Sequence, residues 1–271
     1  MLQKKHQEFS GCSVPILYAG DIFNKWNASP EVINFALANL PEGWAIPGQH
    51  DLPNHNYEEI KRSAYWTLVE AGLLTNLEPD KETEIGGDIL ATGFPWGFDL
   101  KPPRHPGAAV THIAVIHHFI WTNKETGYPG APEASHVKHP TTKFTGYDVE
   151  VYGDNHKGFL LEGSGTNIFN CGALMRRKTD ERNYRPGVGL LHTDGTVTRH
   201  YLDTSQDKFI QATEAEEAVE KILDMTAFVS GLRDLETNDA LDFVTAVKWF
   251  LKDNKVVGRV AEIILEATGC G

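Results

Sequence analysis

Residues 44–51 read WAIPGQHD, a short apolar run that leads directly into a polar loop with a histidine and an aspartate. Three further stretches follow the same plan: VPILYAGD at 14–21, THIAVIHHF at 111–119 and DVEVYGDNH at 148–156. Short apolar runs between loops rich in Gly, Pro and Asn are typical of buried β-strands. The polar residues therefore stand where buried strands are expected to end.

Helical patterns separate the early strands. In residues 30–40 and 57–71, apolar residues recur at spacings of three and four, which favours amphipathic helices. The alternation of strand, helix and strand predicts an α/β fold. Residues 88–106, rich in Gly, Pro and aromatic side chains, are expected to form an ordered loop near the functional site.

The character of the sequence changes after residue 203. Charged segments with Ala, Leu and Val follow, and three of them have the length of helices: 212–230, 238–252 and 256–268. We therefore expect a core over residues 1–203 and a helical C-terminal appendage over residues 204–271.

Composition limits the class of protein. The chain has 271 residues, of which 41% are apolar and 23% charged, as in ordinary globular proteins. Its three cysteines are widely spaced and odd in number, which disfavours a disulfide framework or a thiolate zinc site. It has neither an apolar run of about 18 residues nor a secretory leader, so a cytoplasmic location without a membrane partner is the expectation.

The net charge of −12 disfavours long-range attraction to a polyanion such as DNA. Divalent cations bound at carboxylates would weaken that objection. Each of the four polar loops carries Asp or His, and in open α/β sheets such loops converge beyond the carboxyl ends of the strands. Carboxylate, imidazole and amide groups brought together there predict a divalent metal site.

The order of these motifs carries a family resemblance. The sequence reads GD, then GQHD, then AVIHHF, then GDNH, and it resembles the GD, GNHD, strand-His and GHxH series of the calcineurin-like metallophosphoesterases. The sequence around these motifs is similar to bacteriophage members related to SbcD-like DNA repair nucleases. That likeness covers residues 16–202, and it is carried by GQHDLPNH, SAYWTLVEAG, NIFNCGALMRR and RPGVGLLHTDG.

The resemblance implies a two-sheet β-sandwich flanked by helices, an αββα arrangement, that hydrolyses phosphate esters with two metal ions. By position, Asp21 would bridge the two ions, while Gln49, His117 and Asp154 would complete the shell of the second ion. His156 would bind the first ion. Manganese is the expected metal, with Mg, Fe or Zn as alternatives.

Two further residues would carry catalysis without touching metal. His50 would stabilise charge at the scissile phosphate or protonate the leaving oxygen, and Asp51 would hold its ring in position. Asp51 has a structural alternative as a turn or cap residue, and His118 one as a buried neighbour of His117. The remaining central histidines are expected on loops or the surface: His55, His105, His112, His136 and His139.

One departure from the family concerns the first metal. Nothing before Asp21 has the Asp-x-His form that binds it in the family, so the chain resembles an N-terminally shortened member. Only Asp21 and His156 remain for that position. We therefore expect weak or absent binding of the first ion, and one ion per chain.

Three functions follow as hypotheses. The first is a DNA exonuclease or endonuclease of nucleic-acid processing, located in the host cytoplasm if phage-encoded, with an ATPase partner of the SbcC-like type. The second is a phosphatase for small nucleotides or phosphoproteins, and the third is an inactive remnant or half of a split enzyme.

A basic run is either a phosphate contact or a solvated loop: Arg176, Arg177, Lys178, Arg182 and Arg185.

Overall fold

The computed structural model describes residues 14–105, 110–139, 146–163, 165–176, 181–208 and 252. The chain divides into two compact units, Met1–Gln206 and Asp207–Gly271. Most of the expected helical appendage, together with Cys12, Cys270 and the pair Arg177 and Lys178, lies outside the described residues. Among the described residues, no helix has both the length and the apolar composition needed to cross a membrane.

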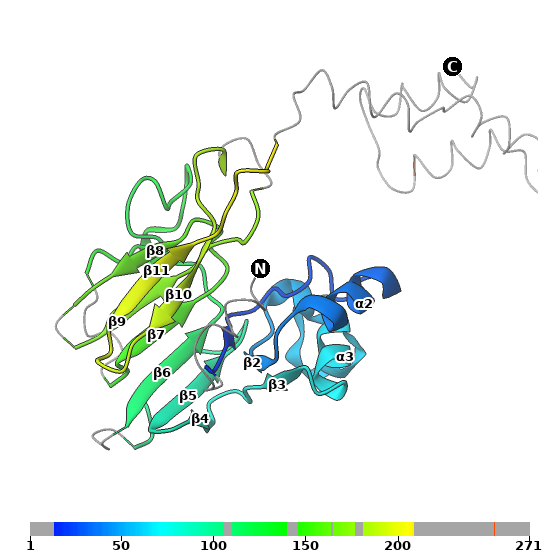
Figure 1. Ribbon diagram of the computed structural model, residues 1–271, viewed down its shortest axis with the longest axis horizontal. Helices are drawn as coiled ribbons and strands as arrows, with labels where there is room; N and C mark the ends of the chain where they lie inside the picture. Colours follow the sequence, from blue (N-terminus) through cyan, green and yellow to red (C-terminus); the bar gives the residue numbers. More distant parts are fainter. Residues whose placement is uncertain are drawn as a thin grey trace, which may run out of the picture. The chain divides into compact units, whose positions relative to one another are not determined.

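A mixed sheet of six strands forms one layer of the first unit, in the order β4-β5-β6-β7-β9-β8 (Figure 1). Strands β5, β6, β7 and β9 run parallel, and β4 and β8 pair antiparallel at the two edges. The bounds are β4 Glu82–Gly86, β5 Ile89–Phe94, β6 Thr111–Ile116, β7 Val149–Tyr152, β8 Phe159–Leu161 and β9 Asn167–Asn170. Both faces of β6 are buried, which explains its nearly unbroken apolar run.

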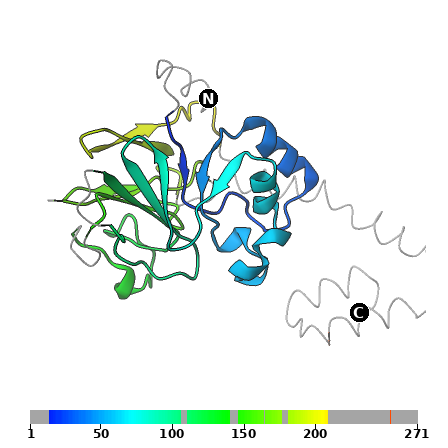
Figure 2. The same cartoon turned by 90° about the horizontal axis from the view of Figure 1, so that it is seen from below.

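A second layer packs on one face of this sheet (Figure 2). It contains a parallel three-stranded sheet and an antiparallel hairpin. The bounds are β1 Leu17–Tyr18, β2 Gly43–Ala45, β3 Leu74–Asn76, β10 Gly187–Leu191 and β11 Val197–Tyr201. The apolar cluster between the layers joins Ile46 and Leu77 to Val115 and Phe169, with Val197 from the hairpin.

Two helices cover the outer face of the three-stranded sheet, α2 Pro30–Asn39 and α3 Ala64–Glu70. Tyr65 and Leu68 of α3 are fully buried in a cluster that includes Ala45 and Leu74 of the sheet. Short 3-10 helices lie in the loops: η1 Gln49–Asp51, η2 Pro53–His55, η3 Tyr57–Arg62 and η4 Glu133–Ser135.

The α/β class is confirmed, with parallel and mixed sheets and few helices. The flanking of a two-sheet sandwich by helices on both sides stays a prediction. The described helices α2 and α3 pack against the three-stranded sheet. On the outer face of the six-stranded sheet, Phe94 and Ile116 pack with Leu100 and Val137 from loops.

Three local predictions were wrong. The helix expected over 57–71 is divided, because Ser63 has an extended backbone and its hydroxyl caps α3 by accepting a hydrogen bond from the N–H of Trp66 at 3.1 Å. The loop expected over 88–106 contains β5, where Gly93 lets the two layers approach: an added Cβ would lie 2.9 Å from Ile46. His112 is buried on β6 rather than at the surface.

Glu150 on β7 makes stability depend on pH. Its carboxylate accepts a hydrogen bond from the Tyr152 hydroxyl at 3.1 Å, and burial raises its pKa from 4.5 to about 7. Because the folded protein binds this proton more tightly than the unfolded chain, the stability it contributes is present below about pH 4.5 and lost as pH rises through about 7.

Replacement of Glu150 by Gln removes this titration and keeps an acceptor for Tyr152. Between about pH 5 and about pH 8, we expect the wild-type free energy of unfolding to fall by roughly 1–3 kcal/mol relative to the variant. Urea denaturation of both proteins at the two pH values measures the difference. A wild-type-to-variant difference that does not change with pH would contradict the assignment.

Candidate metal centre

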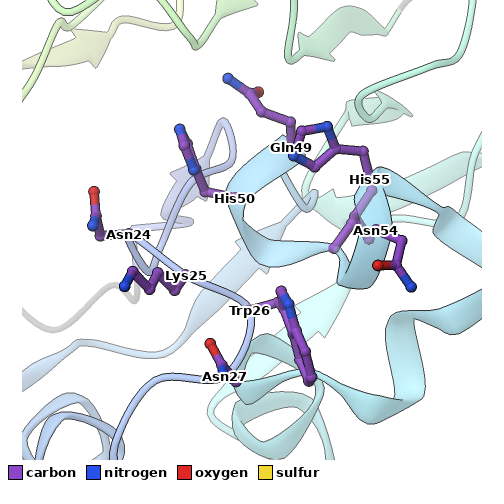
Figure 3. A pocket seen from close by; sticks show the side chains of 9 residues that line it. Asn24, Lys25, Trp26, Asn27, Gln49, His50, Asn54 and His55 are labelled. Carbon is purple, nitrogen blue, oxygen red and sulfur yellow. The ribbon is translucent and has the colours of Figure 1, made fainter. Parts of the chain in front are cut away.

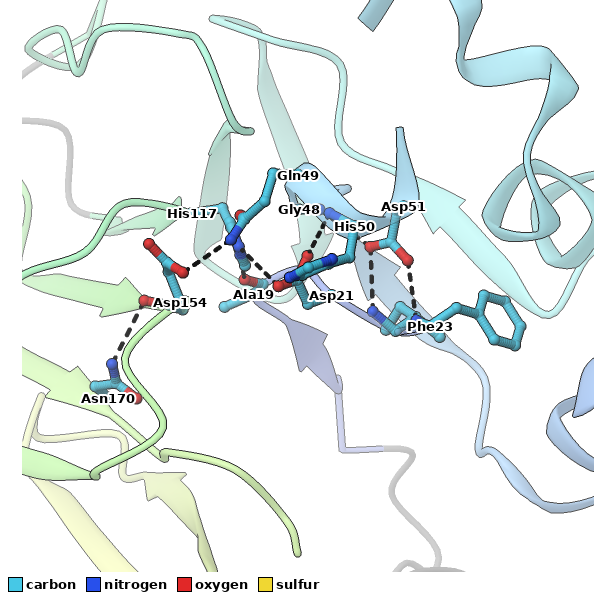
Figure 4. Close-up of polar contacts among 12 residues, drawn as sticks. Ala19, Asp21, Phe23, Gly48, Gln49, His50, Asp51, His117, Asp154 and Asn170 are labelled. Atoms are coloured by element: carbon cyan, nitrogen blue, oxygen red, sulfur yellow. Dashed lines mark hydrogen bonds and ion pairs between the residues drawn. The ribbon is translucent and has the colours of Figure 1, made fainter. Parts of the chain in front are cut away.

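Four loops bring the predicted polar residues to one edge of the two layers (Figure 4). Strands β1 and β2 run parallel, as do β6 and β7, so their carboxyl ends lie at a shared edge. Asp21 follows β1, Gln49 follows β2, His117 comes directly after β6, and Asp154 follows β7. The convergence expected from the sequence is therefore present for these four residues.

Asp21, His117 and Asp154 form a compact cluster. Each offers one ligand atom, and these atoms all lie within 4.8 Å of one another. Gln49 joins them, because its Nε2 donates a hydrogen bond to Oδ1 of Asp154 at 3.0 Å. The set of two carboxylates, one imidazole and one amide suits a hard or borderline divalent cation.

Glycines permit this close approach. A Cβ added at Gly20 would collide with the His117 ring, and one at Gly48 would collide with the Asp21 carboxylate. A Cβ at Gly153 would collide with the Ala19 carbonyl. The glycines in front of three of the four polar motifs therefore have a steric reason, since side chains there would push the loops apart.

The two aspartates of the cluster have left-handed backbones. Asp21 has φ 54° and Asp154 has φ 71°, conformations that few residues other than glycine adopt. Asp tolerates this region because its short side chain forms local hydrogen bonds. Such backbone strain is concentrated at functional sites, where the surrounding structure holds it in place.

His117 is held in one tautomer. Its Nδ1 lies 2.5 Å from the carbonyl oxygen of Ala19, which can only accept, so Nδ1 carries the proton. Its Nε2 points to the cluster and lies 3.5 Å from Oδ2 of Asp21. A backbone carbonyl that fixes the far nitrogen of an imidazole is the usual support of a histidine ligand.

The electrostatics of the cluster are coupled. Burial opposes ionisation of Asp21, but its ion pair with His117 and the hydrogen bond from the His50 N–H outweigh burial and lower its pKa. Burial disfavours charging of His117 too, yet Asp21, the Ala19 carbonyl and Asp154 raise its pKa. Asp21 is therefore held as a carboxylate, and the pKa of the His117 imidazole beside it is raised.

Two buried acceptor atoms indicate that the site fits a cation. His117 is fully buried and its Nε2 has no hydrogen-bond partner among the described residues, and the same is true of Oε1 of Gln49. Buried polar atoms are rarely left without partners. A cation bound between Asp21, Gln49, His117 and Asp154 would satisfy both atoms.

His50 and Asp51 take different places. His50 is exposed, and its backbone N–H donates to Oδ1 of Asp21 at 3.0 Å. Asp51 is fully buried, and its carboxylate accepts from the backbone N–H groups of Ile22, Phe23 and Gly48 at 3.0–3.1 Å. Burial raises its pKa to about 7 despite these hydrogen bonds. These contacts are those of the structural alternative, a carboxylate that ties two loops together.

The other histidines of the motifs lie outside the cluster. His156 is about half exposed, and its Nδ1 lies 3.7 Å from Oε1 of buried Glu181. His118 is half-buried next to His117, and burial followed by the charge of His117 lowers its pKa. The structure therefore brings Asp21, His117 and Asp154 together, with Gln49 hydrogen-bonded to Asp154, and His156 is not part of that group.

Sequence reasoning missed the residues beside the cluster. A pocket of about 300 Å³ adjoins it, and Lys25 and His55 are among its lining residues (Figure 3). His55 is exposed, as expected, but the sequence assigned it no role. The signal available was its position four residues after Asp51 in the same polar loop.

Comparisons with known proteins provide no relative. The chain matches no family model, and no curated protein matches it at a significant level. The resemblance to metallophosphoesterases therefore depends on the motifs and the stretches of sequence around them, and the structural support for a metal site is the cluster of Asp21, His117 and Asp154.

Proposed function

We propose that this chain is a metal-dependent phosphoesterase of the calcineurin-like type that hydrolyses phosphodiester bonds, with DNA as its substrate. The observation that carries the proposal is the convergence of Asp21, His117 and Asp154 from three distant loops, within 4.8 Å of one another. Nε2 of His117 and Oε1 of Gln49 add support, because they are buried without a hydrogen-bond partner in the described part of the chain and can offer lone pairs to a cation.

The chain's own residues would divide the work. A bound divalent cation supplies positive charge that polarises a phosphoryl oxygen and makes water more acidic. Asp21, Gln49, His117 and Asp154 would hold that charge in place. His50 is exposed at the rim of the cluster and would donate a proton to the leaving oxygen or a hydrogen bond to the phosphate. Asp51 would keep the His50 loop in position through its backbone contacts.

One cation per chain, with manganese preferred, is part of the proposal. Two carboxylates and an amide form a harder donor set than a shell dominated by imidazoles, which favours Mn²⁺ or Mg²⁺ over zinc. His156 lies beside Glu181 rather than in the cluster, so a second cation would have fewer donors. Partnership with an ATPase stays a prediction.

The test is hydrolysis by the purified full chain with and without Mn²⁺. Three substrates are compared: a single-stranded oligonucleotide, bis-p-nitrophenyl phosphate and p-nitrophenyl phosphate. We expect Mn²⁺-dependent cleavage of the two diesters, and a loss of at least about 100-fold in kcat/KM for Asp21→Asn, since even outer-shell changes cost 10–100-fold. Asp88→Asn, an exposed aspartate after β4, is the matched control and should retain full activity.

Each outcome separates the hypotheses. Preference for the monoester p-nitrophenyl phosphate would favour a phosphatase over a nuclease. Activity that persists in Asp21→Asn would show that the cluster is not the catalytic site. No Mn²⁺-dependent hydrolysis of any substrate by the wild-type chain would overturn the proposal and favour an inactive remnant or a split enzyme.

A further inference from the structure

The pocket beside the metal cluster has an unusual lining (Figure 3). It measures about 300 Å³ and is formed by two loops, one after β1 and one after β2. Its lining consists of amide, imidazole and amino side chains together with one tryptophan and one leucine. No carboxylate is among them, although the chain has 37 acidic against 25 basic residues, so the pocket is chemically distinct from the rest of the sequence.

The pocket is continuous with the cluster. Gln49 belongs to both, since its side chain lines the pocket and its Nε2 donates to Asp154. His50 also lines the pocket, while its backbone N–H donates to Asp21. A substrate with one phosphate at the cluster would therefore pass His50 and extend its next group into the pocket.

The lining groups suit the oxygens of an anion. Lys25 supplies one positive charge, and the side chains of asparagine and histidine supply hydrogen-bond donors. The nearby carboxylate of Glu59 accepts from Asn54 at 3.4 Å and is ion-paired with Arg62, which compensates its charge. A tetrahedral phosphate, which accepts several hydrogen bonds, matches this set better than a cation or an apolar group.

The two loops that form the pocket are held in place before any substrate binds. Asn54 and His55 have φ 52° and 57°, two consecutive left-handed residues. Among the described residues, five residues other than glycine have a positive φ. Four of them lie here: Asn54 and His55 line the pocket, and Asp21 and Asp154 belong to the adjoining cluster. Asp51 ties the two pocket loops together through backbone N–H groups of both. Strain held by such contacts is typical of preformed binding sites.

We propose that this pocket is a second phosphate subsite, which binds the phosphate next to the one positioned at the metal cluster. The inference rests on the proposed phosphoesterase function and deepens it: the substrate carries consecutive phosphates, as a nucleic-acid strand or a nucleoside polyphosphate does. Lys25 contributes the charge, and Asn54 and His55 contribute hydrogen bonds.

The first test compares Lys25→Gln with wild type on substrates with and without a second phosphate. We expect the ratio of kcat/KM for an oligothymidylate to kcat/KM for bis-p-nitrophenyl phosphate to fall by about 5- to 20-fold, as for the loss of one charged contact. Lys25→Arg should restore most of the ratio. Lys124→Gln, an exposed lysine on another loop, should leave it unchanged. An unaltered ratio in Lys25→Gln would overturn the subsite.

Binding separates failure of the subsite from failure of the proposed function. Fluorescence anisotropy of labelled oligothymidylate with Ca²⁺ measures affinity without turnover, and a nucleoside triphosphate serves as competitor. If Lys25→Gln weakens binding about 5- to 20-fold while the wild type hydrolyses nothing, the subsite stands and the enzyme assignment fails. Equal affinity of Lys25→Gln and wild type overturns the subsite. Competition by the triphosphate at low concentration would identify a nucleotide rather than a strand as the substrate.

Discussion

Replacement of His117 by Gln is expected to lower the affinity of the chain for Mn²⁺ by at least about 100-fold. His117 provides the single imidazole of the cluster, and its Nε2 is buried with no hydrogen-bond partner among the residues that the structure describes. Asp154→Asn keeps the size of the side chain and tolerates the left-handed backbone but removes one negative charge, so a loss of about 10-fold is expected. Calorimetric titration of the full chain with Mn²⁺ measures both affinities.

His118→Gln is the matched control for this experiment. His118 is adjacent in sequence and half-buried but is not part of the cluster. The affinity of the His118→Gln variant for Mn²⁺ should therefore stay within about twofold of that of the wild type. Thermal unfolding of each variant with a chelator shows whether it is folded. Wild-type affinity in His117→Gln would contradict the site, and two tight sites in the wild type would contradict the expectation of one ion.

The ligand cluster was predictable because its geometry follows from a simple rule of parallel strands. His117 stands directly after the buried run of β6 and Asp21 shortly after the half-buried β1, and the carboxyl ends of parallel strands meet at one edge. The glycines at 20, 48 and 153 reinforced the pattern for a reason that the structure reveals: each leaves space for a neighbouring loop of the site. Strand pattern and loop position thus sufficed to predict that these loops converge, while the role of each residue came from the family resemblance.

The features that were not predicted depend on contacts in the folded chain that local sequence patterns do not reveal. The partner of His156 is Glu181, which belongs to none of the motifs. β5 was missed because Gly93 and the aromatic-rich loop after it resemble a coil, although Gly93 is needed where the two layers approach. The break at Ser63 was missed because the apolar spacing continues across it, while the backbone does not.

Asp51 illustrates the same limit and leads to the prediction with the largest effect on stability. The family resemblance implied that its carboxylate would hold the His50 ring, with a turn or cap residue as the alternative. In the structure it accepts hydrogen bonds from the backbone N–H groups of Ile22, Phe23 and Gly48, donors that no sequence motif displays. Because Asp51 is fully buried, removal of its carboxylate leaves these three donors without their acceptor, and the donors of Phe23 and Gly48 are buried away from water.

Asp51→Ala is therefore expected to lower the free energy of unfolding by about 3–5 kcal/mol, since each buried donor left unsatisfied costs about 1–3 kcal/mol and neighbouring losses are not additive. Asp51→Asn keeps one acceptor oxygen, so a smaller loss is expected. Urea denaturation in the presence of a chelator measures both, because bound metal would otherwise add stability of its own. Asp88→Ala, at an exposed aspartate, should stay within about 0.5 kcal/mol of wild type. If Asp51→Ala cost no more than Asp88→Ala, the two loops would not depend on this carboxylate, and the pocket that they form with the metal cluster would need another support.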